Sequence, residues 1–171
     1  MTNIKIFELN RAENRNAEEY PAVQDVQTIV ASPDEGRERI EACIRHLLEL
    51  RATGDVEAMA AYAAPDVVFK TPAGRAHPFH APREGRDACR ELGYEVNVAY
   101  ENLGSRLNKL LIDGDRVAIH RTARIRNRGA GEPIEVDIWN FLRFRDGLIV
   151  EFSEYPDTAV FARLDAPNEV A

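Results

Sequence analysis

Three polar side chains in the segment from Asp115 to Asp157 have the types and spacing best suited to chemistry. Arg121 and Asn140 each interrupt a run of apolar residues at every second position, and Asp157 closes the segment. Because successive side chains of a strand point to opposite faces, Arg121 and Asn140 are predicted on covered faces. A buried guanidinium is costly unless it meets an anion, and a carboxamide can donate to a carbonyl oxygen. Burial raises the pKa of a carboxylate toward neutrality, which suits Asp157 to act as a general acid or base.

We therefore predict that Asp157 and Arg121 are catalytic and that Asn140 binds substrate, with Arg121 as the electrostatic partner of Asp157 or of a substrate oxygen. Each residue also has a structural alternative. Asp157 can cap a helix that begins at Thr158, and Arg121 can form a buried ion pair with Glu154. Asn140 can be a core amide whose hydrogen bonds are satisfied within the protein.

The strand that ends at Asp157 has the least regular alternation. One of its faces carries Leu148, Val150, Phe152 and Glu154, and the other carries Ile149, Glu151, Ser153, Tyr155 and Asp157. This alternation turns Asp157 away from the face of Glu154, unless a bulge or turn at Tyr155-Pro156 re-aims it.

The predicted substrate-binding set also includes Tyr155, His80 and Tyr62, with a packing role as the alternative for Tyr155. His77 and His80 belong to a loop over residues 71–84 that could form the rim of a pocket. The two histidines lack the further ligands of a zinc site, so we predict no metal and no organic cofactor.

These side chains must be positioned by three strands between Asp115 and Asp157, with the second turn at Arg145 to Gly147. Other elements are predicted from caps, breakers and spacing. They are a helix from Ser32 to Gly54, a short helix from Asp55 to Pro65, a strand over 66–70, a helix over 86–102, a strand over 103–112 and a helix over 158–164. This order predicts an α+β fold in which helices pack on one face of a curved, mostly antiparallel sheet. We interpret residues 1–31 as an N-terminal extension and 32–171 as one domain.

The composition narrows the class of protein. The 171 residues carry a formal net charge of -7, with 44% hydrophobic and 30% charged residues. These values are typical of a soluble globular protein and argue against nucleic acid or an anionic membrane as a partner. The chain has no run long enough to span a membrane and no signal-peptide core. Cys43 and Cys89 are expected to be free thiols, which favours a cytoplasmic location.

Trp139 and Phe141 are large apolar residues on what should be the outer face of the sheet. An exposed patch of this kind usually marks a subunit interface, so we expect a homodimer through this face. Partial cover by the N-terminal extension is the alternative.

Over about Pro33 to Leu164 the chain resembles the nuclear transport factor 2-like superfamily, which includes ketosteroid isomerase, limonene epoxide hydrolase and the SnoaL-like polyketide cyclases. The resemblance implies a cone-shaped domain in which three to four helices and a curved sheet enclose an apolar pocket, with dimers across the outer sheet face. The best-matching segments are Ala52-Thr53-Gly54-Asp55, Pro65 to Phe69, Arg143 to Phe152, and Glu154-Tyr155-Pro156-Asp157-Thr158.

The resemblance to the enzymes of this superfamily is partial. Asp157 matches the carboxylate at the end of the last strand in the epoxide hydrolase and the SnoaL-like cyclases, and Arg121 falls at the hydrolase's pocket arginine. Ala123 stands where the hydrolase has its second aspartate, and Thr71 where ketosteroid isomerase has its base aspartate. The isomerase's protonated aspartic acid falls near Asn140. The pattern of a SnoaL-like cyclase, with one acid-base aspartate, fits best.

These observations leave three functions to distinguish. The first is a cofactor-independent isomerase, cyclase or hydrolase that acts on a small apolar carbonyl or polyketide-like compound by acid-base catalysis. The second is a non-catalytic small-molecule binder that uses the same pocket. The third is a dimerising scaffold with a filled core, since domains of this fold serve unrelated functions.

Overall fold

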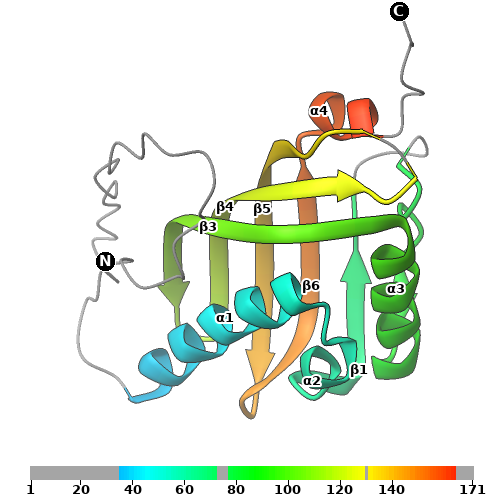
Figure 1. The fold of residues 1–171 in the computed structure, drawn as a ribbon. Coiled ribbons are helices and arrows are strands. Elements are labelled where there is room, and N and C mark those ends of the chain that lie inside the picture. Colours follow the sequence, from blue (N-terminus) through cyan, green and yellow to red (C-terminus); the bar gives the residue numbers. More distant parts are fainter. Residues whose placement is uncertain (1–34, 73–76, 130, 165–171) are drawn as a thin grey trace, which may run out of the picture.

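The computed structural model describes residues 35–72, 77–129 and 131–164, which form an α+β fold (Figure 1). The predicted extension, residues 1–31, lies outside the described residues. The described elements are α1 (Glu35–Thr53), α2 (Val56–Ala60), β1 (Ala63–Lys70), β2 (Arg83–Glu84), α3 (Arg86–Ala99), β3 (Tyr100–Asp113), β4 (Arg116–Asn127), β5 (Ile134–Arg145), β6 (Leu148–Pro156) and α4 (Thr158–Leu164).

The strands form a six-stranded sheet in the order β2-β1-β6-β5-β4-β3. Only the pairing of β1 with β6 is parallel, so the prediction of a mostly antiparallel sheet is confirmed. Figure 1 shows β3 and β4 bending along their length, while α1 crosses in front of the sheet with α2 and α3 beside it. Register shifts in β3 between Asn102 and Ser105, and between Leu107 and Lys109, accompany this bend. The sheet is therefore concave on the side that the helices cover.

The covered faces predicted for β4 and β5 are confirmed, although Thr122 on the opposite face of β4 is also buried. On β4 the buried residues include Val117, Ile119, Ala123 and Ile125, with Arg121 among them. On β5, Asn140 lies on the buried face with Val136, Ile138, Leu142 and Phe144. Because the helices cover this face, the two polar residues point to the interior of the domain.

Two local predictions about the elements are wrong. The helix after Asp55 ends at Ala60, and Pro65 lies inside β1 rather than before it. Proline is tolerated there because the pairing of β1 with β6 is irregular between Ala63 and Val68. In β6, a register shift opposite Arg143 and Phe144 skips Val150. This bulge brings Ile149, rather than Val150, to the face of Phe152 and Glu154.

Candidate functional site

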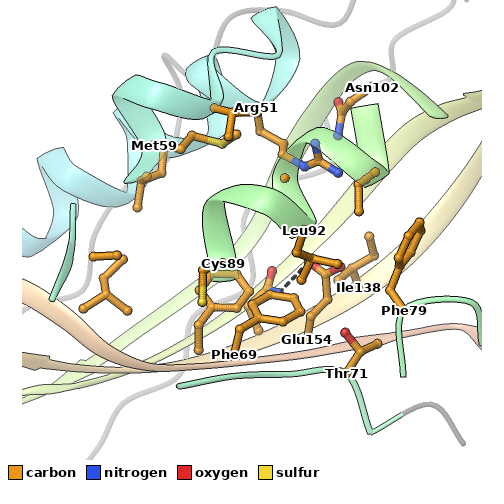
Figure 2. Close-up of a pocket in the computed structure, with 18 of the residues that line it drawn as sticks. Arg51, Met59, Phe69, Thr71, Phe79, Cys89, Leu92, Asn102, Ile138 and Glu154 are labelled. Carbon is orange, nitrogen blue, oxygen red and sulfur yellow. Dashed lines mark hydrogen bonds between the residues drawn. The ribbon is translucent and has the colours of Figure 1, made fainter. Parts of the chain in front are cut away.

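A cavity of about 230 Å³ lies between the concave face of the sheet and helices α1, α2 and α3 (Figure 2). Its volume is below the range of about 300–1,000 Å³ that is common for drug-sized ligands, so a small ligand would fit. The wall is mostly apolar and includes Leu48, Phe69, Leu92, Ile138 and Phe152. Polar side chains are few, and they come from the sheet, from Arg51 of α1, from Arg90 of α3 and from the loop residues Thr71 and His77.

The polar residues of the sheet side form one hydrogen-bonded cluster across four neighbouring strands. Arg121 of β4 donates from Nε to Asn140 Oδ1 at 2.9 Å, from Nη1 to Ser105 Oγ at 3.0 Å and from Nη2 to Glu154 Oε2 at 2.9 Å. Asn140 donates from Nδ2 to the same oxygen of Glu154 at 3.1 Å. Arg121 is only 4% exposed, and this cluster provides the anion and the acceptors that a buried guanidinium needs.

Glu154 is the only aspartate or glutamate among the described residues that line the cavity. Burial alone would raise the pKa of Glu154, but the guanidinium groups of Arg121 and Arg51 and the hydrogen bonds from Asn140 and Arg121 outweigh it. The pKa of Glu154 is therefore lowered, and its carboxylate is ionised near neutral pH. No described residue donates to its second oxygen, Oε1, while 25% of the side chain is exposed.

Arg51 is a second cation at the cavity, contributed by the last turn of α1. Its Nη1 donates to Asn97 Oδ1 of α3 at 3.0 Å. Burial lowers the pKa of the Arg51 guanidinium, whereas Glu154 raises it. Within the described part of the chain, no direct ion pair joins Arg51 to Glu154. The charge of each residue therefore acts on the other across the cavity.

The structure brings together only part of the predicted site. Arg121 and Asn140 line the cavity, and they converge on Glu154 rather than on Asp157. Asp157 is exposed and does not line the cavity. Its Oδ1 accepts from the backbone N–H groups of Ala159 and Val160 at 3.0 and 3.1 Å, so it caps α4. The sequence left the direction of Asp157 open, and the structure places this side chain outside the cavity.

The other predicted substrate-binding residues also lie outside the cavity wall. Tyr155 is exposed on the outer face and packs edge-on against Phe141, with ring centroids 5.6 Å apart. His80 is exposed, and its Nδ1 lies 2.8 Å from the backbone oxygen of His77. Tyr62 is half-buried and packs against the hydrophobic core. Of the loop histidines, His77 is the one in the wall, where it is buried against Phe161.

Sequence reasoning missed Glu154 and Arg51 as site residues, although each left a signal. Glu154 shares the covered face of its strand and was the predicted alternative partner of Arg121. Arg51 falls in the apolar stripe of the first helix, together with Ile44, Leu47 and Leu48. A lone charge in a buried helix stripe is as informative as one in a buried strand face.

Within the described ranges, no group of three His, Cys, Asp or Glu side chains is placed to hold a metal ion. The same residues contain no helix with the length and apolarity needed to cross a membrane.

A curved sheet whose helices enclose a cavity is the architecture of a nuclear transport factor 2-like domain. The sequence matches the model of the SnoaL-like domain over residues 44–152, and the chain belongs to this family. The resemblance inferred from the sequence is thereby confirmed. No match is found among curated proteins.

Solved structures with low sequence identity share the fold. A Bacillus subtilis protein provisionally named an isomerase has a TM-score of 0.70 at 16% identity, covering 77% of this chain and 96% of its own. A Catenulispora acidiphila protein with a ketosteroid isomerase-like fold, solved with trimethylamine, has a TM-score of 0.63 at 20% identity, covering 75% and 96%. A Xanthomonas campestris protein provisionally named a polyketide cyclase has a TM-score of 0.61 at 19% identity, covering 77% and 100%.

Proposed function

We propose that the cavity binds a small, largely apolar carbonyl compound and that Glu154 acts on it as a general base without a cofactor. The observation that carries this proposal is an ionised carboxylate in a mostly apolar cavity, with one oxygen held by Arg121 and Asn140 and the other accepting nothing from the described residues. Such an oxygen is available to a proton of the ligand. Membership of the SnoaL-like family and the provisional names of the isomerase and cyclase neighbours support the same class of reaction.

The positions of Glu154, Arg51 and Arg121 favour removal of a proton from the ligand to form an enolate. Glu154 Oε1 takes a proton from the carbon next to the carbonyl group, and the electron pair of the broken C–H bond moves to the carbonyl oxygen as an enolate. Return of the proton to another carbon of the ligand gives an isomer. Attack of the carbanion on a second carbonyl group of the ligand instead closes a ring, and the alkoxide formed there takes the proton back from Glu154. Arg51 and Arg121 stabilise the negative charge of the enolate through the low-dielectric interior.

A non-catalytic binder is the second candidate, and the Arg121 ion pair favours it. A general base works best when its pKa lies near the working pH, and this ion pair helps to lower the pKa of Glu154. Tight binding of a carbonyl compound without any proton exchange would identify the chain as a binder.

Deuterium exchange tests the proposed chemistry without knowledge of the final product. The chain is incubated in D₂O with a panel of cyclic ketones, enones and 1,3-dicarbonyl compounds, and deuterium at the acidic carbon is followed by NMR. We expect exchange with the wild type and a loss of at least about a hundredfold with Glu154→Gln, as is typical for removal of a general base.

Asp157→Asn is the matched control, since it makes the same change of carboxylate to carboxamide outside the cavity. It should exchange at the wild-type rate. Equal exchange by wild type and a folded Glu154→Gln variant would refute the role of Glu154. The wild type supplies a second readout, because its exchange should fall as acid protonates Glu154.

A further inference from the structure

The guanidinium of Arg51 is a hydrogen-bond donor group that the protein uses only in part. Arg51 has five N–H groups, and within the described ranges a single protein hydrogen bond is made, from Nη1 to Asn97 Oδ1 at 3.0 Å. The bond to Asn97 joins α1 to α3 and so fixes the direction of the side chain. The remaining donors belong to a residue of the cavity wall, which places them within reach of a bound molecule.

Asn102 of β3 adds a second donor at the same end of the cavity. Its Oδ1 accepts from the backbone N–H of Gly104 at 2.9 Å, which assigns the amide orientation and leaves Nδ2 as the donor. No described residue accepts from this Nδ2. Figure 2 shows Asn102 and the guanidinium of Arg51 on the same side of the cavity, away from Glu154, Phe69 and Thr71.

The balance of charge in the wall is positive. Arg121 is paired with Glu154 at 2.9 Å, and Arg90 faces Asp87 at 3.2 Å. Arg51 therefore remains as a cation without a carboxylate in direct contact. The surplus is local, because the whole chain has a formal net charge of -7. Because Arg51 is half-buried, solvent offsets its charge only in part, and an anionic group on the ligand would stabilise this end of the cavity.

We infer that Arg51 and Asn102 form a carboxylate-binding site, so that the ligand is a carboxylic acid with an apolar body. Arg51 donates to the carboxylate from two of its remaining N–H groups, and Asn102 Nδ2 donates a third hydrogen bond. The apolar body lies against Phe69 and Leu92. This assignment rests on the proposed function in that it uses the same cavity, and it narrows the substrate from a carbonyl compound to an oxo-acid.

Isothermal titration calorimetry with matched ligand pairs tests the site. Each pair is a carboxylate and the primary amide of the same skeleton, such as 3-phenylpropanoate with 3-phenylpropanamide and cyclohexanecarboxylate with its amide. We expect the wild type to prefer at least one carboxylate over its amide by tenfold to a hundredfold, as estimated for charged hydrogen bonds. Arg51→Gln should abolish this preference without weakening the amide. Arg45→Gln, which changes an arginine of α1 that pairs with Glu41, should keep it.

Asn102→Asp is a second variant that keeps the acceptor for the Gly104 N–H and places a carboxylate beside Arg51. It should lower carboxylate affinity at least as much as Arg51→Gln. The inference is overturned if no carboxylate of the panel binds more tightly than its amide, or if the preference survives Arg51→Gln or Asn102→Asp. A carboxylate preference without deuterium exchange would keep this site and reject the proposed catalysis. Deuterium exchange of neutral ketones without any carboxylate preference would keep the proposed catalysis and reject this site.

Discussion

Arg121 joins the strands that bear the polar residues of the cavity. Its three hydrogen bonds reach Ser105, Asn140 and Glu154, each on a different strand. A guanidinium suits this position because its donors form a rigid planar fork. The result is a carboxylate that is held in place and ionised, with one oxygen still accessible. Arg121 is a lone charge on an apolar strand face, and this pattern correctly indicated a polar cluster. The sequence did not identify Glu154 as the residue on which Arg121 and Asn140 converge.

The ionisation of Glu154 predicts a specific pH dependence of stability. Its pKa is lower in the folded chain than the value of about 4.3 expected after unfolding. The stabilisation it provides is therefore complete above about pH 4.3 and is lost as the pH falls through the folded pKa. Glu154→Gln should lower the free energy of unfolding by about 1–3 kcal/mol at pH 7, because Arg121 loses its anion.

Urea denaturation from pH 7 to pH 3 measures this difference, which should shrink toward zero at the acid end. Glu151→Gln is the control, since its ion pair with Arg143 is exposed and contributes little. A difference between wild type and Glu154→Gln that stays constant with pH would contradict the ionised state of Glu154.

The secondary-structure elements show which parts of the fold could be predicted from the sequence. Alternation on β4 and β5 gave the correct faces because both strands pair regularly with one another from Arg116 to Ile125. Pro65 and the bulge at Val150 were missed because both depend on how β1 and β5 pair with β6, which no local pattern records. The side chain of Asp157 matched a helix cap and a catalytic carboxylate equally well in the sequence, and the structure shows the cap.

Contact between α2 and α3 predicts that Gly93→Ala destabilises the chain. Helix propensity alone favours alanine by about 1 kcal/mol. However, a Cβ at Gly93 would lie 2.9 Å from Cγ1 and 3.3 Å from Cγ2 of the buried Val56. Valine has one strongly preferred rotamer in a helix, so its side chain cannot easily move away. The clash should exceed the gain in propensity and lower the melting temperature.

A double-mutant cycle isolates this contact. Gly93→Ala should cost less stability in a Val56→Ala background than in the wild type, as measured by thermal unfolding. A rise in melting temperature for Gly93→Ala in the wild-type background would show that the two helices separate at little cost.

Among the surfaces of the described residues, the outer face of the sheet is best suited to a partner. Trp139, Phe141 and Tyr155 are 41%, 49% and 42% exposed, and all three lie on β5 or β6. His120 stacks on Trp139 with ring centroids 4.7 Å apart, which orders the patch. Exposed aromatic groups of this kind are typical of interfaces, and dimers through this face are expected from the resemblance to the superfamily.

We therefore predict that the chain forms a dimer that Phe141→Glu dissociates, because a charge would be buried at the centre of the interface. Sedimentation equilibrium over a range of micromolar concentrations measures the mass. Val98→Glu places the same charge on an exposed residue of α3 and should leave the dimer intact. A monomeric wild type, or a dimer that persists in Phe141→Glu, would contradict the interface.

The most direct test of Glu154 as a general base inside the cavity is a crystal structure of Glu154→Gln. The crystal should contain a ligand in which the wild type exchanges deuterium. The distance to measure joins the ligand's acidic carbon to the nearest side-chain atom at position 154. We predict about 3–3.5 Å, the separation of groups poised to react, with the ligand between the sheet and α1. A ligand bound outside the cavity, or one whose acidic carbon lies beyond the reach of position 154, would contradict a role for Glu154 as the general base.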